Sequence, residues 1–235
     1  MAKGLKVSVI LPCYNEQDNL PNIISKCEEL KSKSFNSYEF IFVNNGSKDL
    51  TDNILDQFCD GVSFRKLTIE KNIGYGNGII EGCRMAKSDY IAWTHADLQT
   101  DIHDIDRGLC FLATDTSFVK GFRVNRKLVP KLLSIGMSVL TLFVQGIWVS
   151  EINAQPKIMP RKFFMEHVEN APLDFSLDLF YCLKAKSLKN YSEFPVQFCK
   201  RINGYSKGGE SNLKTRLQII FRTAKFIFKL KKNIN

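Results

Sequence analysis

The sequence lacks the cysteine spacing of a zinc site or of a disulfide-rich domain. Its seven cysteines are scattered and odd in number, and no two of them form a Cys-x-x-Cys pair. This distribution is typical of reduced thiols in a cytosolic protein. The first residues, Met1–Lys6, also contain no apolar signal segment before the first expected strand. We therefore expect the protein in the cytoplasm.

Internal repeats and low-complexity linkers are also missing, so the 235 residues predict one large domain, or one domain with an appendage. The net charge of +9 lies almost entirely at the C-terminal end. Residues 201–235 contain nine Lys or Arg and one Glu, whereas residues 1–200 contain 24 basic and 23 acidic side chains. A neutral body with a basic tail can contact anionic lipid, nucleic acid or water.

The first hundred residues alternate between two hydrophobic patterns. Apolar runs predict strands at residues 6–11, 38–43, 64–69 and 90–94, and helical spacing predicts helices at 19–30, 49–59 and 78–86. Strands that alternate with helices are typical of a parallel sheet with helices on both faces. Further along the chain we expect strands at 117–122 and 151–159 and a helix from Asp174, with Asp174 as its N-cap.

Three polar side chains follow the expected strand at 90–94 at alternate positions, namely His95, Asp97 and Gln99. Alternate side chains of an extended strand point the same way, and ligands of open α/β sheets bind beyond the carboxyl ends of the strands. A carboxylate, an imidazole and an amide oxygen suit a Mn²⁺ or Mg²⁺ ion shared with a phosphate. A strand followed by a polar helix cap is the alternative.

Five motifs in order carry a resemblance to a known family. They are Val9–Glu16 (VILPCYNE), Phe42–Asp49 (FVNNGSKD), Asn72–Gly76 (NIGYG), Asp89–Ile91 (DYI) and His95–Gln99 (HADLQ). Together they resemble the family 2 glycosyltransferases, which implies the GT-A fold, an α/β fold with a mostly parallel sheet flanked by helices. Asp97–Gln99 and Arg201–Lys207 (RINGYSK) are similar to the polyprenyl-phosphate branch, which includes dolichol-phosphate mannose synthase. The resemblance covers about residues 6–208.

The resemblance implies a nucleotide-sugar site with a divalent metal. Its substrate-binding residues would be Pro12, Tyr14, Glu16, Asn44, Gly74, Asp97, Gln155 and Lys207, and its metal ligands Asp97, Gln99 and His95. Asn44 and His95 both stand where the family usually has Asp, and Asn44 leaves the identity of the base open because an amide can donate or accept. The run Gly74–Gly78 lacks the Gly-x-Gly-x-x-Gly spacing of a dehydrogenase. We expect these glycines to allow close approach at a helix start.

The resemblance also implies an acceptor site. Arg123 would lie near the acceptor phosphate, with Lys120 and Arg126 as helpers, and a solvated charge cluster is the alternative. Arg201 would close over the donor phosphates together with Lys207. Asp178 would be the general base for a hydroxyl acceptor, whereas a phosphate acceptor is already an anion and needs no strong base. In that case Asp178 would only orient Arg or Lys side chains.

Two segments suggest contact with a membrane. Residues 132–150 contain no charged side chain, and this 19-residue length is near the minimum for a spanning helix, so we favour an interfacial or buried helix. Residues 213–232 have an apolar stripe and a basic face, the pattern of a helix that lies in a membrane interface. The alternative is a helix docked on the catalytic domain or on a partner.

The sequence therefore predicts a glycosyltransferase domain over residues 1–209 and a basic amphipathic helix over 210–235. We expect an inverting, metal-dependent enzyme that transfers a sugar from a nucleotide sugar to a polyprenyl phosphate for cell-surface glycans. It would be peripheral on the inner face of the membrane. The alternatives are transfer to a sugar hydroxyl of a growing polysaccharide and a non-catalytic relative that binds nucleotide or lipid. Nucleic acid is not an expected partner, because no recognition motif accompanies the basic tail. A homo-oligomer is left open.

Overall fold

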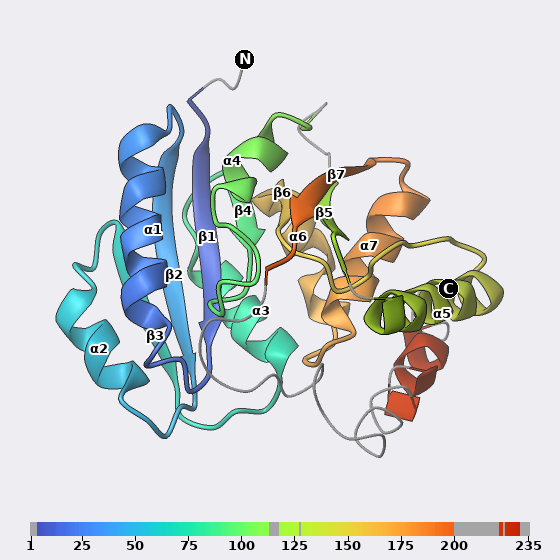
Figure 1. Ribbon diagram of the computed structural model, residues 1–235, viewed down its shortest axis with the longest axis horizontal. Coiled ribbons are helices and arrows are strands. Elements are labelled where there is room, and N and C mark those ends of the chain that lie inside the picture. The colour runs from blue at the N-terminus through green and yellow to red at the C-terminus, as the bar shows by residue number, and fades with distance from the viewer. Residues whose placement is uncertain (1–3, 113–117, 127, 200–220, 223, 231–235) are drawn as a thin grey trace.

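The computed structural model describes residues 4–112, 118–126, 128–199, 221–222 and 224–230. Seven strands form one sheet in the order β3-β2-β1-β4-β6-β5-β7 (Figure 1). The strands are β1 (Lys6–Cys13), β2 (Ser37–Asn45), β3 (Phe64–Ile69), β4 (Tyr90–Trp93), β5 (Phe118–Val124), β6 (Lys157–Pro160) and β7 (Tyr191–Gln197). The helices are α1 (Leu20–Lys33), α2 (Thr51–Phe58), α3 (Tyr75–Met85), α4 (Asp104–Leu109), α5 (Leu128–Gln145), α6 (Arg161–His167), the 3-10 helix η1 (Val168–Asn170) and α7 (Leu177–Ser187).

The N-terminal half of the sheet follows the predicted pattern. β1 pairs in parallel with β2 on one side and β4 on the other, and β2 pairs in parallel with β3. The predicted helix at 19–30 is α1, whose buried residues Leu20, Ile23, Ile24, Cys27 and Leu30 recur at three- and four-residue spacing. These parallel strands bring their carboxyl ends to one edge of the sheet, where a ligand site is expected.

The C-terminal half is mixed, because β6 runs antiparallel to both β4 and β5, while β7 is parallel to β5. The predicted strand at 151–159 is wrong at its start, since β6 begins only at Lys157. Glu151 has φ +41°, and its carbonyl accepts the N–H of Ala154 at 2.8 Å, so this part of the chain turns. Asp174 is not the N-cap of α7 either: Ser176 holds that position, and the Asp174 carboxylate accepts its N–H at 2.9 Å.

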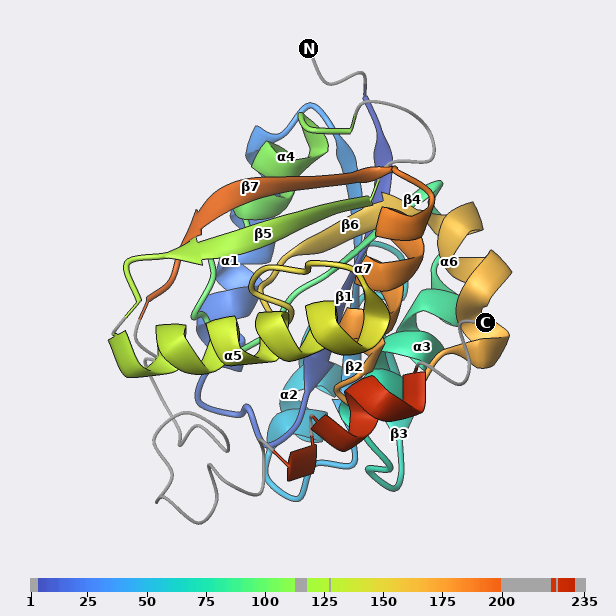
Figure 2. The same ribbon diagram turned by 90° about the vertical axis from the view of Figure 1, so that its right-hand side faces the viewer.

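Two apolar clusters cover the two faces of the sheet. One face is covered by α1, α2 and α4, which contribute Ile23, Leu55 and Ile105 to the core. The other is covered by α3, α6 and α7, with Trp93, Phe180 and Tyr181 among its largest buried side chains (Figure 2). Both faces of the strands are thus removed from water, as a parallel sheet requires.

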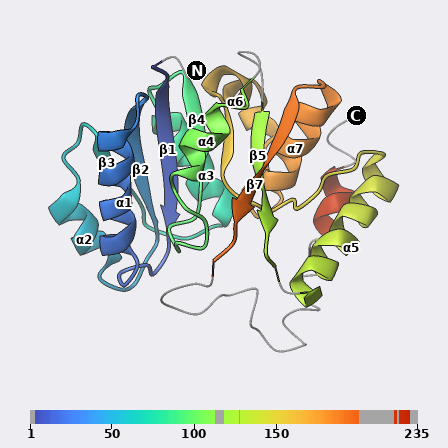
Figure 3. The same ribbon diagram turned by 45° about the horizontal axis from the view of Figure 1, so that its top comes forward.

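Helix α5 lies on the β5–β7 side of the molecule, away from α1 and α2 (Figures 1 and 3). It is the only helix of the described residues that is long and apolar enough to cross a membrane, and only 17% of its residues are buried. Residues 221–222 and 224–230 are helical and lie beside α5 (Figure 2). Ile227 and Leu230 are buried, and the Gln145 amide donates to the Ile227 carbonyl at 2.6 Å. This contact favours the docked alternative for the C-terminal helix.

Candidate functional site

The loops after β1 and β2 form one edge of the sheet and are tied together by hydrogen bonds. Cys13 and Asn44 are partners in the β1–β2 register, so the loops begin side by side. The Asn15 N–H donates to the Ser47 hydroxyl at 3.0 Å, and the Glu16 N–H donates to the Thr51 hydroxyl at 2.9 Å. The predicted donor-site residues Pro12, Tyr14, Glu16 and Asn44 therefore come together at this edge, the first three of them half-buried.

Asn44 is already engaged within the protein. Its amide nitrogen donates to Asp52 at 2.7 Å, its oxygen accepts the Ser47 N–H at 3.0 Å, and only 3% of the residue is exposed. Asp52 also accepts from Lys66 and Thr68, both at 3.0 Å. The hydrogen bond from Asn44, followed by that from Lys66, holds the pKa of the Asp52 carboxyl below its ordinary value. Sequence reasoning missed Asp52, because nothing in the spacing shows that it faces Asn44.

The glycines at the start of α3 allow a close approach, as predicted. Gly74 has φ +151°, and a Cβ atom there would lie 2.2 Å from the Leu173 carbonyl oxygen. A Cβ atom at Gly76 would lie 2.6 Å from the Pro172 carbonyl oxygen, and the Asn77 N–H donates to the Leu173 carbonyl at 2.9 Å. These contacts fix the start of α3 against the segment that precedes α7.

His95, Asp97 and Gln99 follow β4 but do not continue it. The strand ends at Trp93, the chain turns at residues 96–97, and Leu98 has φ +59°, so the alternation of an extended strand does not apply. The Asp97 carboxylate accepts the Gln99 N–H at 3.1 Å, and the His95 ring centre lies 5.5 Å from that of Tyr75. All three side chains are half-buried.

The turn after β4 offers one carboxylate, one amide and one imidazole as possible metal ligands. Across the described ranges, no group of three or more His, Cys, Asp or Glu side chains is placed to hold a metal ion by itself. Mg²⁺ in phosphate sites is usually held by one or two carboxylates, with substrate phosphates and water completing its shell. One carboxylate with an amide oxygen and an imidazole fits an ion that is shared with a diphosphate.

Asp178 lies at the centre of a buried polar network. Its carboxylate is 2.9 Å from the Lys157 ammonium and accepts the Trp93 indole N–H at 3.2 Å. The Gln155 amide donates to Asp178 at 3.4 Å and to the Tyr75 hydroxyl at 3.0 Å. Asp178 and Lys157 are 1% and 0% exposed. Sequence reasoning gave no role to Lys157, whose charge stands within an apolar run.

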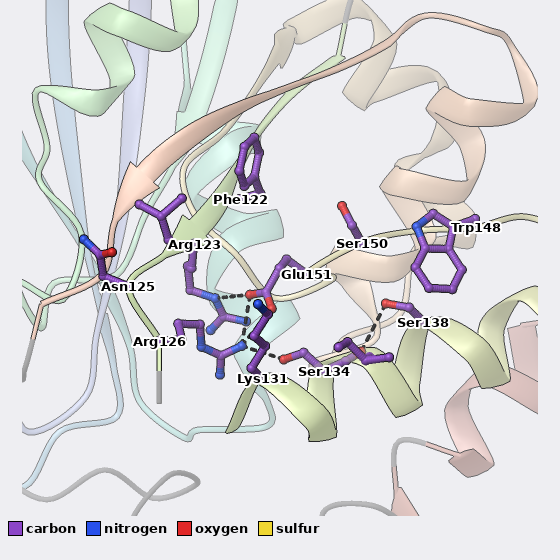
Figure 4. Close-up of a pocket in the computed structure, with 12 residues that line it drawn as sticks. Phe122, Arg123, Asn125, Arg126, Lys131, Ser134, Ser138, Trp148, Ser150 and Glu151 are labelled. Atoms are coloured by element: carbon purple, nitrogen blue, oxygen red, sulfur yellow. Dashed lines mark hydrogen bonds and ion pairs between the residues drawn. The ribbon is translucent and has the colours of Figure 1, made fainter. Parts of the chain in front are cut away.

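A cavity of about 530 Å³ opens between the end of β5, the first half of α5 and residues 148–151 (Figure 4). Arg123, Arg126 and Lys131 supply positive charge to it, and Ile135 and Trp148 supply apolar surface. Arg123 and Arg126 thus line the same cavity.

Lys120 does not line this cavity. The prediction that it assists Arg123 there is therefore corrected. Lys120 is fully buried and donates to the carbonyls of Gly121, Ser150 and Glu151 at 3.0, 3.0 and 3.2 Å. Its ammonium also lies 3.3 Å from Glu193. Burial lowers the pKa of Lys120, but its role is to hold the turn at 150–151. Arg201, Lys207 and residues 213–220 lie outside the described residues.

Comparisons with known proteins identify relatives of this chain. The sequence profile described as Glycosyl transferase family 2 matches residues 8–164. A dolichol-phosphate mannosyltransferase of Pyrococcus furiosus is 29% identical over 247 aligned residues, which cover 97% of this chain and 64% of that protein. An undecaprenyl-phosphate 4-deoxy-4-formamido-L-arabinose transferase of Pseudomonas fluorescens is 30% identical over 52% of this chain and 36% of its own length. The chain thus spans between about a third and two thirds of these relatives.

Solved structures share the fold. A glucosyl-3-phosphoglycerate synthase of Mycobacterium tuberculosis, in complex with Mn²⁺, UDP and glucosyl-3-phosphoglycerate, has a TM-score of 0.70 and 14% identity. The superposition covers 97% of this chain and 80% of that one. A mannosyl-3-phosphoglycerate synthase of Rubrobacter xylanophilus has a TM-score of 0.73 and 15% identity, with coverage of 97% and 74%.

Proposed function

The chain belongs to glycosyl transferase family 2, and from this premise we propose that it transfers a sugar from a nucleotide sugar to a polyprenyl phosphate, with inversion at the anomeric carbon. Two relatives are named for transfer to dolichol phosphate and undecaprenyl phosphate. The observation that carries the proposal is the composition of the cavity beside α5. A lipid phosphate needs cations for its head and apolar surface for its chain, and this cavity offers both.

The burial and the polar contacts of Asp178 support a phosphate acceptor over a hydroxyl acceptor. A general base must reach the proton that it removes. The Asp178 carboxylate is buried and is engaged by Lys157, Trp93 and Gln155, so it is not placed to take a proton from a sugar hydroxyl. An acceptor phosphate is already an anion, and its oxygen can attack the anomeric carbon while the nucleoside diphosphate leaves. Asp178 then has the positioning role.

The donor would lie at the carboxyl ends of β1, β2 and β4. We assign the nucleoside to the edge formed by Pro12, Tyr14, Glu16 and Asn44, and the diphosphate to the side of Asp97. Asp97 and Gln99, with His95, are the residues that would hold Mn²⁺ or Mg²⁺. Such an ion stabilises the negative charge that develops on a leaving diphosphate. Arg201 and Lys207 would add positive charge over the donor phosphates.

We place the protein on the inner face of a membrane, with α5 in the interface. Several apolar side chains of α5 face solvent, including Leu132 and Phe143, which are 56% and 81% exposed. Lys131 lies on the same helix and also lines the cavity. A lipid phosphate held in the cavity would therefore have its chain beside the apolar surface of α5, at the depth of the membrane interface.

The test is release of nucleoside diphosphate from a panel of nucleotide sugars with Mn²⁺ or Mg²⁺ present. We expect release when a short polyprenyl phosphate is added and none with the matching polyprenol. Equal release with a sugar acceptor would instead favour transfer to a hydroxyl. If a nucleoside diphosphate raises the melting temperature but no acceptor gives turnover, the chain is a binding relative without catalytic activity.

A further inference from the structure

Glu151 holds the position between Arg123 and Arg126 that an anion would take. The Arg123 Nε lies 2.6 Å from the Glu151 carboxylate, and the Arg126 guanidinium lies 2.8 and 3.0 Å from its two oxygens (Figure 4). The side chains of the two arginines are only 13% and 11% exposed. Two adjacent cations that are largely shielded from water repel each other, so they need a counter-ion. Sequence reasoning assigned no role to Glu151.

The backbone of Glu151 is held in place by groups outside the cavity. Its φ of +41° is in the region that favours glycine and is strained for Glu. The Lys120 ammonium and the Ala154 N–H both donate to its carbonyl, at 3.2 and 2.8 Å. Buried Lys120 thus fixes the backbone of Glu151. Figure 4 shows the Glu151 side chain directed at the two arginines.

The two guanidinium groups have supports other than Glu151. The Phe198 ring centre lies 5.3 Å from the guanidinium carbon of Arg123 and 5.7 Å from that of Arg126. Arg126 also donates to the Ser134 hydroxyl at 2.7 Å. Stacking on an aromatic ring orients a guanidinium. The arginines therefore stay in the cavity when the carboxylate is removed or displaced.

We propose that the Glu151 carboxylate is an internal counter-ion, which competes with the phosphate of the acceptor for Arg123 and Arg126. This inference rests on the proposed function and concerns the affinity of the same site. A phosphomonoester carries about −1.5 to −2 charges at neutral pH and can displace a carboxylate. Transfer makes a new bond from a phosphate oxygen to the anomeric carbon, while the bond from that carbon to the nucleoside diphosphate breaks, so the product is a phosphodiester with one negative charge. The product therefore binds the two arginines more weakly than the acceptor does, and competition from Glu151 keeps its affinity low enough for release.

The test is equilibrium binding of decyl phosphate, a monoester, and decyl methyl phosphate, a diester, by calorimetry at fixed ionic strength. We expect Glu151→Gln to bind both about tenfold more tightly, as removal of a close competing charge predicts. Glu166→Gln is the matched control: it removes the same charge from an exposed position on α6, outside the cavity, and should leave both affinities unchanged. Arg126→Met should abolish binding of either ligand.

The outcomes separate this inference from the function on which it rests. If Arg126→Met binds decyl phosphate as well as the natural protein, the cavity is not the acceptor site and both proposals fail. If Arg126 is required but Glu151→Gln binds equally or more weakly, the acceptor site stands and the counter-ion is disproved. Should Glu151→Gln not fold, Glu151→Asp replaces it, since its carboxylate is one methylene shorter. Tighter binding by Glu151→Asp supports the proposal, and equal or weaker binding overturns it.

Discussion

The ammonium group of Lys157 lies 2.9 Å from the carboxylate of Asp178, and their side chains are 0% and 2% exposed. Lys157 begins β6 and Asp178 lies in the first turn of α7, so this pair joins two elements under the candidate site. Lys157 also donates to the Ala154 carbonyl at 3.0 Å, and the Trp93 indole of β4 donates to Asp178. Each buried charge is thus compensated by several polar groups, as burial requires.

The pair predicts the effect of Asp178→Asn. We expect a loss of about 3–5 kcal/mol in the free energy of unfolding, because the buried Lys157 ammonium loses its counter-ion. Urea denaturation measures this loss. The double variant Asp178→Asn with Lys157→Met should recover most of it, since it leaves no buried charge. With a phosphate acceptor, the folded fraction of Asp178→Asn should keep measurable turnover. A loss of 100-fold or more in the folded protein would restore the general-base role.

Asp97 is the one carboxylate of the candidate metal site, so its substitution tests the proposed binding of the metal ion and of the nucleotide-sugar donor. We expect Asp97→Ala to abolish sugar transfer and the metal-dependent part of nucleotide binding. Its melting temperature without ligand should stay close to that of the natural protein, because the hydrogen bond lost is the half-buried contact to the Gln99 N–H. Thermal shifts with a nucleoside diphosphate, with and without Mn²⁺, measure the effect. Near-normal turnover in this variant would show that the metal assignment is wrong.

Asn44 and Asp52 form an amide–carboxylate pair that Asn44→Asp would turn into two carboxylates. The natural Asp52 has a pKa below its ordinary value, so its contribution to stability is present at neutral pH and is lost as the pH falls through the acidic range. In Asn44→Asp the two charges repel, and the deficit in stability should be largest at neutral pH and shrink on acidification.

The matched control is the double variant Asn44→Asp with Asp52→Asn, in which the amide and the carboxylate have changed places. It should recover most of the stability that Asn44→Asp loses. Unfolding measured from pH 4 to pH 7 compares the three proteins. A deficit that does not depend on pH would disprove the repulsion.

We also expect Asn44→Asp to change the preference among nucleotides, and unchanged affinity for all of them would remove Asn44 from base recognition.

The local elements could be predicted from the sequence, and the long-range pairs could not. The strands β1 to β4 were visible as short apolar runs, and β1 is buried along almost its whole length, whereas α1 was visible because its buried residues recur every three to four positions. The glycines of α3 were visible because close approach favours that residue. The pairs Lys157–Asp178 and Asn44–Asp52 depend on packing between separate elements, which spacing does not show. For the same reason the antiparallel direction of β6 and the turn at Glu151 were missed.

Gly74 offers a test of the junction between α3 and the segment before α7. We expect Gly74→Ala to destabilise the protein by more than about 3 kcal/mol, because the new Cβ atom would lie 2.2 Å from a backbone carbonyl in addition to the strain of positive φ. Gly61→Ala is the control, since Gly61 has φ +73° with no atom within 4 Å of its Cβ position. It should cost only about 1–2 kcal/mol. Equal losses in urea denaturation would show that no close contact exists at Gly74.

The last prediction concerns the membrane face of α5. Removal of the C-terminal helix is a poor test of membrane binding, because Ile227 and Leu230 are buried in the core and their loss should also lower stability. Point substitutions on the exposed face of α5 avoid this effect. Phe143 is 81% exposed, and its transfer into a membrane interface would contribute about 1.5–3 kcal/mol, or about tenfold or more in affinity.

We therefore expect Phe143→Ser to weaken sedimentation with anionic liposomes by about tenfold or more, while its melting temperature stays unchanged. Phe35→Ser is the matched control, since Phe35 is 93% exposed and comes two residues after α1 in the chain. Helix α1 lies on the opposite side of the molecule from α5 (Figure 1). Phe35→Ser removes the same side chain and should leave sedimentation unchanged. Equal weakening by both substitutions would indicate a general effect of surface hydrophobicity. If the natural protein does not sediment with anionic liposomes at low salt, α5 does not lie in the membrane interface.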